Sequence, residues 1–216
     1  AKEALFNILN NYFHWDEIKT LDLFSGTGNI SFELASRGVQ ELTAVDQNKY
    51  CIYFIDQTAK SFDMPITVIK NSVERFLSKP AGTFNFIFAD PPYVFSKDQL
   101  LTLAAQLLDN NWLCKEGLLV IEHVSHLDLS QHPLCYEDRI YGSSRFSFFS
   151  KAKEEELKAG HKPDSVVSYH LSRFTITHEL KPPTLLFRTS RSQTQIYLAL
   201  HRIEFTWFHY SLTCTF

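Results

Sequence analysis

The sequence predicts an α/β protein built on a doubly wound, mostly parallel sheet of seven strands. Three observations predict this fold class. Strand-like apolar runs alternate with helix-like segments over the first 150 residues, which is typical of parallel sheets. A glycine turn, Gly26-Thr27-Gly28, joins the first strand to the helix after it. Polar residues follow directly after several strands, at the edge where such sheets bind ligands.

Each element is expected from its own pattern. The helices carry apolar residues at helical spacing, and the strands are short runs bounded by turn formers. Gly142-Ser143 is a hairpin signal between the last two strands, and it makes one strand antiparallel. The expected helices cover residues 2–12, 29–37, 48–62, 72–79 and 97–110, and the expected strands cover residues 20–24, 41–46, 66–70, 84–90, 117–123, 135–141 and 144–150.

The first strand leads into the loop Phe24–Asn29, and the helix after it is expected to end at Gly38. Gly26 and Gly28 would let the backbone approach an adenosyl ligand closely, and the helix N-terminus would favour a carboxylate. Ser31 replaces the third glycine of the dinucleotide-binding fingerprint, so the full fingerprint is absent. Taken alone, the two glycines are equally explained by a strand–helix turn without a ligand.

Asp46 ends the second expected strand, twenty residues after Gly26. An acid at this place accepts hydrogen bonds from ribose hydroxyls in dinucleotide-binding folds. A second interpretation is that Asp46 caps the helix expected over 48–62, because Asp is a favoured N-cap residue, and one Asp can fill both roles. The order of glycine loop, acid and the motif described next favours ligand binding.

That motif is Asp90-Pro91-Pro92-Tyr93, directly after the apolar run 84–89. The prolines fix φ and remove two backbone donors, so the segment is a stiff turn with carbonyl acceptors beside the Asp90 carboxylate. Such acceptors suit the exocyclic NH2 group of a base, and the Tyr93 ring offers a face for stacking. A surface turn is the alternative, because Asp and Pro are both turn formers.

From Ala1 to about Phe149 the chain resembles the bacterial 16S rRNA guanine-N2-methyltransferases of the RsmD type. The resemblance rests on the motifs above and on three further segments, Glu3–Leu9, Asn71-Ser72 and Arg139–Gly142. It implies a Rossmann-like class I methyltransferase sheet, S-adenosylmethionine as methyl donor, and the exocyclic amine of a guanine in 16S rRNA as acceptor. The implied partner is 16S rRNA or a small-subunit assembly particle, and we expect a monomer that does not associate with membranes.

The resemblance also predicts the site residues. The acceptor site comprises Asp90, Pro91, Pro92 and Tyr93. No metal ligand is predicted, because a sulfonium is already an activated methyl donor. The predicted donor-binding residues are Asp22, Phe24, Gly26, Gly28, Asn29, Asp46, Gln47, Ser72 and Val73.

The chain departs from the family pattern at both ends. It begins in mid-helix without the basic N-terminal segment of family members, and residues 151–216 lie beyond the pattern. Residues 1–150 hold 12 Lys and Arg against 18 Asp and Glu, whereas nucleic-acid enzymes usually present a basic face. A local patch of Lys97, Arg139 and Arg145 would offset this balance. We therefore expect the chain to bind RNA weakly.

Composition sets the remaining expectations. With 216 residues and 44% hydrophobic content, the chain is long enough to bury the core of one main domain, expected over residues 1–150. Residues 151–216 hold nine Lys and Arg against six acids and read either as a poorly ordered tail or as an RNA-contacting appendage. No signal peptide or bilayer-length apolar run is visible. The cysteines lack metal-ligand spacing and are expected to be reduced thiols in a cytoplasmic protein; they are Cys51, Cys114, Cys135 and Cys214.

Several other functions use parts of the same pattern. DNA adenine-N6 or cytosine-N4 methylation uses the same acceptor motif, but no inserted target-recognition domain is present between residues 38 and 90. Protein glutamine methyltransferases usually begin the motif with Asn, and this chain has Asp90. A nicotinamide-dependent oxidoreductase would leave the acceptor motif without a role and lacks a catalytic Tyr-x-x-x-Lys. A non-enzymatic binder of an adenosyl ligand is the remaining alternative.

Overall fold

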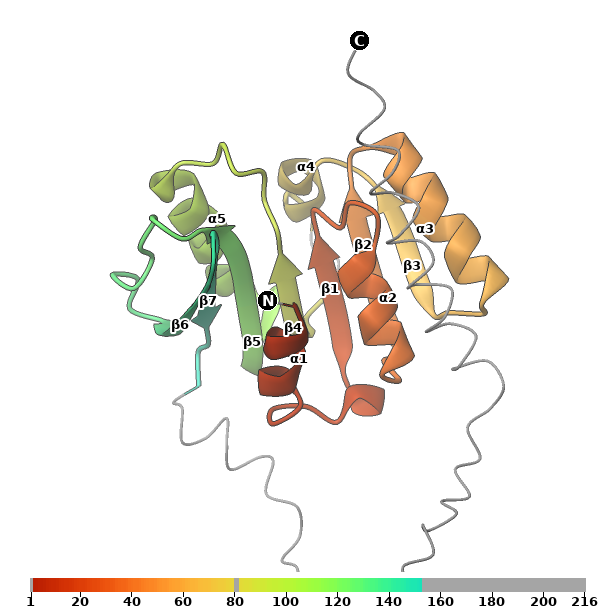
Figure 1. Ribbon diagram of the computed structural model, residues 1–216, viewed down its shortest axis with the longest axis horizontal. Coiled ribbons are helices and arrows are strands. Elements are labelled where there is room, and N and C mark those ends of the chain that lie inside the picture. The colour runs from red at the N-terminus through yellow and green to blue at the C-terminus, as the bar shows by residue number, and fades with distance from the viewer. Residues whose placement is uncertain (1, 80–81, 153–216) are drawn as a thin grey trace, which may run out of the picture. The chain divides into compact units, whose positions relative to one another are not determined.

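The computed structural model describes residues 2–79 and 82–152, which form a seven-stranded sheet with helices on both faces (Figure 1). The strand order is β3-β2-β1-β4-β5-β7-β6. All strand pairs are parallel except those of β7, which runs antiparallel to both of its neighbours, β5 and β6. The expected doubly wound sheet with one antiparallel strand is therefore confirmed. The strands are β1 (Lys19–Leu23), β2 (Glu41–Asp46), β3 (Ile66–Lys70), β4 (Phe84–Ala89), β5 (Leu113–Val124), β6 (Cys135–Tyr141) and β7 (Ser144–Phe149).

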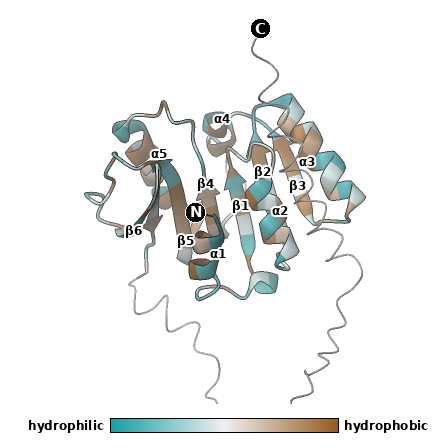
Figure 2. Cartoon of the chain, viewed as in Figure 1, coloured by the Kyte–Doolittle hydropathy of each residue, from teal (hydrophilic) through white to brown (hydrophobic). Residues whose placement is uncertain are grey.

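The helices cover the two faces of the sheet. Figure 1 shows α1 and α2 in front of the strands, and the buried side chains of α4 and α5 pack on the opposite face. The central strands β4 and β5 are strongly hydrophobic, as Figure 2 shows, because helices bury them on both sides. The α-helices are α1 (Lys2–Leu9), α2 (Asn29–Ser36), α3 (Lys49–Ser61), α4 (Val73–Leu77) and α5 (Lys97–Asp109), and a short 3₁₀ helix, η1, spans Trp15–Glu17.

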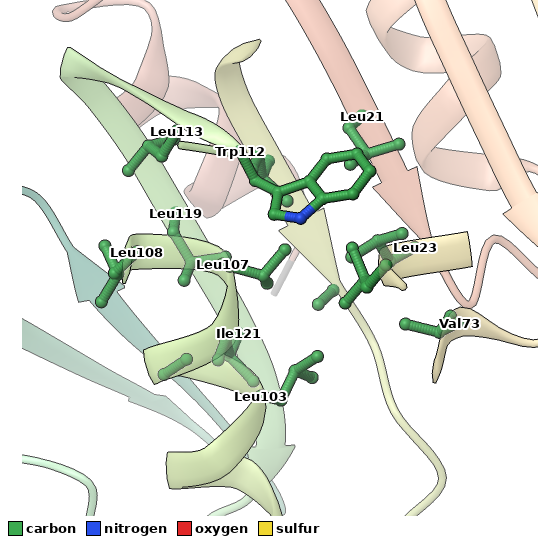
Figure 3. Close-up of a cluster of buried hydrophobic side chains, with 14 of the residues drawn as sticks. Leu21, Leu23, Val73, Leu103, Leu107, Leu108, Trp112, Leu113, Leu119 and Ile121 are labelled. Carbon is green, nitrogen blue, oxygen red and sulfur yellow. The ribbon is translucent and has the colours of Figure 1, made fainter. Parts of the chain in front are cut away.

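Trp112 anchors the core between the sheet and helices α4 and α5. Its ring stacks on Phe84 with a centroid distance of 6.3 Å and lies 5.2 Å from the ring of Phe76. Figure 3 shows Trp112 beside Leu21 of β1 and Leu107 of α5, so one side chain joins the loop before β5 to both layers. Truncation of a buried Trp costs about 3–5 kcal/mol of stability, which makes this residue a main fold determinant.

Aromatic residues form the core on the other face, under α1. The Phe13 ring lies 5.7 Å from Phe86 of β4, and Phe6 of α1 packs beneath the guanidinium of Arg37 at 4.6 Å. These contacts hold α1 over the centre of the sheet. The first residues of α1 therefore lie near the carboxyl end of β4, where the charge of Lys2 acts on Asp90.

Two element bounds differ from the sequence prediction by three residues or more. The first helix ends at Leu9 and not at residue 12, because turns follow in which Asn10 and Tyr12 donate to the carbonyls of Phe6 and Leu9. Strand β5 begins at Leu113, four residues earlier than expected. Its first residues pair with Phe84 across a register shift, which the polar stretch before Gly117 concealed.

The hairpin at Gly142-Ser143 is confirmed, with Gly142 at φ +63° between β6 and β7. The helix end at Gly38 is also confirmed: Gly38 has φ +106°, and the Val39 N–H donates to the Leu34 carbonyl. In the part of the chain that the structure describes, no helix is long and apolar enough to cross a membrane. The two interpretations of residues 151–216, a poorly ordered tail and an RNA-contacting appendage, concern a segment that lies outside the described residues from position 153 on.

Candidate active site

Four predicted site segments meet at the carboxyl edge of the sheet, where the arrowheads of β1 and β4 lie in Figure 1. The glycine loop follows β1, Asp46 closes β2, Ser72 follows β3, and Asp90 follows β4. Strand β1 is central, and its last residue, Leu23, pairs with Val45 on one side and Ala89 on the other. Because these strands are parallel neighbours, segments far apart in sequence converge there.

The glycine loop has the backbone that its residues require. Gly26 and Gly28 have φ +52° and +82°, and Phe24 is a non-glycine residue at φ +58°. A Cβ atom on Gly28 would lie 2.8 Å from the Ile55 side chain, so this glycine allows α2 and α3 to pack closely. A Cβ atom on Gly26 would meet only the Phe24 carbonyl, at 4.0 Å, so this glycine faces open space.

Asp46 connects the ends of β1 and β2. Its Oδ2 accepts a hydrogen bond from the Gly26 N–H at 2.9 Å, and its Oδ1 accepts one from the Asn48 N–H at 2.7 Å. The interpretation of Asp46 as a helix cap is wrong: Asn48 is the N-cap of α3, and its side chain accepts from the Tyr50 N–H. Each carboxylate oxygen of Asp46 keeps a second lone pair for a ligand.

Asp22 lies beneath the glycine loop and is only 1% exposed. Its Oδ2 accepts a hydrogen bond of 2.5 Å from the Ser31 hydroxyl in the first turn of α2. Burial raises the pKa of Asp22 to about 7, the Ser31 hydrogen bond opposes that rise, and the charge of Asp90 adds to it. In this structure Asp22 therefore ties β1 to α2 and supports the loop from below.

The remaining predicted donor-binding residues surround the same edge. Ser72 is the N-cap of α4 and accepts from the Arg75 N–H, whereas Gln47 and Asn29 are exposed. Phe24 and Val73 line a pocket of about 290 Å³ between α4 and α5. Its lining is completed by Glu74, Leu77, Phe95, Asp98, Gln99, Thr102, Leu103 and Gln106, and most of the lining residues from α5 are polar.

The acceptor segment is a turn held at both ends. The Asp90 N–H donates to the Leu23 carbonyl at 3.3 Å, and the Phe95 N–H donates to the Pro92 carbonyl at 2.9 Å. Among the backbone hydrogen bonds of the described residues, the Pro91 carbonyl accepts none. Tyr93 is 64% exposed, so its ring face is open to a planar partner.

Burial raises the pKa of Asp90 to about 7. The negative charge of Glu122 adds to the rise, and the positive charge of Lys2 opposes it. Perturbed carboxyl groups in a cleft mark functional sites more often than chance, because burial tunes their protonation. The Asp90 carboxyl group is thus poised between its charged and neutral forms near neutral pH.

Glu122 is a further candidate site residue, and the sequence prediction did not include it. It lies at the carboxyl end of β5 and is 8% exposed. Ala89 pairs with Ile121, so the next step along both strands brings Asp90 beside Glu122. The available signal was an acid that ends the apolar run 118–121, but only the strand pairing connects that acid to Asp90.

Two of the three basic residues considered for a local patch are paired with acids. Arg145 lies 2.8 Å from Asp138 and 3.1 Å from Asp128, and Arg139 pairs with Glu137. Neighbouring carboxylates therefore match both positive charges. These two arginines therefore do not offset the acidic balance of residues 1–150.

Comparisons with known proteins agree with the geometry. The family described as Conserved hypothetical protein 95 matches residues 1–150. The Bacillus subtilis protein YlbH is 33% identical over 137 residues, which cover 61% of this chain and 72% of YlbH. A Haemophilus influenzae relative named "Ribosomal RNA small subunit methyltransferase D" is 35% identical over 128 residues, which cover 56% of this chain and 64% of the relative. The chain thus spans about two thirds of the length of these relatives.

The fold also matches solved structures. The crystal structure of the Haemophilus influenzae protein HI0767 superimposes with a TM-score of 0.61 at 24% identity, covering 70% of this chain and 96% of that protein. At this level of identity, the likeness concerns the fold. It agrees with the seven-stranded sheet that the alternating sequence pattern predicts.

Proposed function

Because the chain belongs to the family described as Conserved hypothetical protein 95, we propose that it transfers a methyl group from S-adenosylmethionine to the N2 amine of a guanine in 16S rRNA. The resemblance of the sequence to RsmD-type enzymes supports the same activity. The observation that carries this proposal is the convergence of two motifs at one sheet edge. The Asp46-bound glycine loop and the Asp90–Tyr93 turn follow neighbouring strands, β1 and β4. The name of the Haemophilus relative, a small-subunit rRNA methyltransferase, supports methyl transfer to rRNA.

The glycine loop and its neighbours fit the donor. Gly26 leaves open space where a ligand can approach the backbone, and the spare lone pairs of Asp46 suit two ribose hydroxyls. The pocket lined by Phe24 and Val73 offers apolar surface for the adenine ring. When bound, S-adenosylmethionine supplies an electrophilic methyl group on a positively charged sulfur.

The acceptor turn fits an aromatic amine. We assign stacking of the flipped-out base to the exposed ring of Tyr93. The amine donates one hydrogen bond to the Asp90 carboxylate and one to the Pro91 carbonyl, which accepts no other described hydrogen bond. Pro92 directs its carbonyl to the Phe95 N–H and thereby holds the turn in shape.

These contacts assist the transfer by orientation. The lone pair of a guanine amine is delocalised into the ring, and two acceptors on its protons favour a pyramidal nitrogen with an available lone pair. Alignment of this nitrogen with the methyl carbon is worth about 7–11 kcal/mol of the barrier. The N–C bond forms as the C–S bond breaks, and the bonding electrons stay on sulfur. The methylated nitrogen then loses a proton to Asp90 or to solvent.

The proposal also covers the form of the substrate, the oligomeric state and the location of the protein. The substrate is 16S rRNA or a small-subunit assembly particle, and the protein acts as a monomer in the cytoplasm. Residues 1–150 form the methyltransferase domain. The acidic balance of this domain and its paired arginines support weak affinity for free RNA.

The direct test is methyl transfer by the purified chain to small-subunit rRNA, assembled particles, DNA and protein, with nucleoside mass spectrometry of the products. We expect N2-methylguanosine in rRNA. Asp90→Ala should abolish turnover and keep S-adenosylmethionine binding, Tyr93→Phe should keep much of the activity, and Tyr93→Ala should lose most of it. Methylation of DNA or protein alone, or normal kcat in the Asp90→Ala variant, would refute the assignment.

A further inference from the structure

We propose that Glu122 reads the N1–H group of the target guanine and so determines which base is methylated. This inference rests on the proposed function and extends it from the amine to the edge of the base. Guanine presents two neighbouring donors on this edge, N1–H and the N2 amine. Adenine and cytosine present a ring-nitrogen acceptor beside their amine. A second acceptor next to Asp90 therefore selects guanine.

The strand pairing places Glu122 correctly for this role. Ala89 pairs with Ile121, and one further step along each strand brings Asp90 beside Glu122. Both residues follow the same alternation: Phe86 and Phe88 precede Asp90, and Leu118 and Val120 precede Glu122, on the sheet face that α1 covers. Neighbouring strands lie about 4.8 Å apart, a spacing that allows two carboxylates to accept from adjacent donors of one base.

The side chain of Glu122 is available to a hydrogen-bond donor from a ligand. Glu122 is only 8% exposed. Among the described residues, its side chain has neither a hydrogen bond nor an ion pair. Its carboxyl oxygens are not among the fully buried polar atoms that lack a partner, so they keep access to open space. A buried carboxyl group is favourable only with a donor, and the N1–H of a bound guanine is one.

No group of three or more potential ligands within residues 2–79 and 82–152 is arranged to hold a metal ion. The charge of Glu122 also acts on Asp90, which agrees with their proximity. The two acids together form a surface that accepts hydrogen bonds and rejects a ring nitrogen with a lone pair.

The test is a specificity switch with 2-aminopurine, which keeps the N2 amine but has an unprotonated N1. The methylated guanine is first located with the unmodified enzyme. Ligated rRNA then carries guanine or 2-aminopurine at that position, in the free or particle form that the enzyme accepts. The unmodified enzyme should prefer guanine at least about 100-fold in kcat/KM. Glu122→Gln, whose amide can donate to N1, should reduce this preference at least about tenfold and improve activity on 2-aminopurine.

Two further variants complete the design. Glu122→Met removes all hydrogen bonding at similar length, so it should lose guanine activity without gaining activity on 2-aminopurine. Glu116→Gln makes the same charge change at the exposed opposite end of β5 and should keep the original preference. Thermal unfolding and S-adenosylmethionine binding verify that each variant is folded.

The outcomes separate this inference from the proposed function. An unmodified enzyme that forms no N2-methylguanosine refutes the proposed function. An enzyme that forms it, with a folded Glu122→Gln variant that keeps the original preference, refutes only the role of Glu122.

Discussion

The Asp46 carboxylate accepts a hydrogen bond from the Gly26 N–H at 2.9 Å, across the twenty residues that separate them. This bond joins the end of β2 to the loop after β1. The second oxygen of Asp46 accepts from Asn48 and so orients the entry to α3. One side chain thus shapes both walls of the proposed donor site before any ligand binds.

Replacement of Asp46 by Ala should weaken S-adenosylmethionine binding by about 1–3 kcal/mol, or roughly ten- to a hundredfold. The variant loses the acceptors for ribose and the bond that shapes the loop. Isothermal titration calorimetry measures the change. Asp56→Ala is the control: Asp56 of α3 pairs with Lys60 and Gln57 among the described residues, and this variant should bind S-adenosylmethionine with unchanged affinity. If the Asp46→Ala variant bound S-adenosylmethionine as tightly as the unmodified protein, the assignment of Asp46 to the donor site would be contradicted.

Replacement of Gly26 by Val should reduce donor affinity more than it reduces stability. The new side chain would project into the open space where a ligand approaches, and the positive φ of +52° adds backbone strain. Gly38→Val is the matched control, because Gly38 also has a positive φ, +106°, and open space around it, but lies after α2. Thermal unfolding and calorimetry on both variants separate strain from blocked binding; similar donor affinity in both would count against the loop.

The rate of methyl transfer should rise with pH between about 6 and 8, because the Asp90 pKa is raised to about 7 and the ionised carboxylate is the better acceptor. Glu122 faces Asp90 and raises its pKa, Asp22 also lies near, and Lys2 opposes the rise. Glu122→Gln should therefore move the midpoint of the kcat profile to lower pH. A flat profile over this range in the unmodified enzyme would show that Asp90 ionisation is unimportant.

The raised pKa values of Asp22 and Asp90 also affect the stability of the fold. A carboxyl group with a higher pKa in the folded state binds more protons there than in the unfolded chain between pH 4 and 7. Asp22 and Asp90 therefore lower stability as pH rises through this window. Asp22→Asn should flatten this part of the curve, as measured by urea unfolding at several pH values. An unchanged slope would indicate that Asp22 is ionised throughout.

Removal of residues 153–216 should preserve the fold and donor binding. Strand β7 ends at Phe149. The last described hydrogen bonds run from the Ser150 hydroxyl to the Gly117 carbonyl, from Lys151 Nζ to the Leu113 carbonyl, and from the Ala152 N–H to the Ser150 hydroxyl. The cut must therefore follow Ala152. A truncated chain with an unfolding temperature within a few degrees of the full chain is the expected result. Loss of cooperative unfolding would show that the removed residues stabilise the domain.

The sequence by itself determined the fold class and the position of the site. Alternating patterns with periods of two and 3.6 residues reflect which side chains each element must bury, so local hydrophobicity was sufficient to place the strands and helices. Gly142 and Gly38 marked a turn and a helix end because few other residues adopt their backbone angles. The order of the glycine loop, Asp46 and Asp90 located the carboxyl edge, since parallel strands all end there.

Only the tertiary structure decided what each polar residue contacts. Asp22 supports the loop from below, Asp46 binds Gly26 instead of capping a helix, and Arg145 is paired with acids. Glu122 became a site residue because β5 lies beside β4, although 32 positions separate it from Asp90. Strand neighbours in a parallel sheet are joined through long connections, so their register depends on the packing of the whole layer. That information is distributed over the chain and is absent from any local pattern.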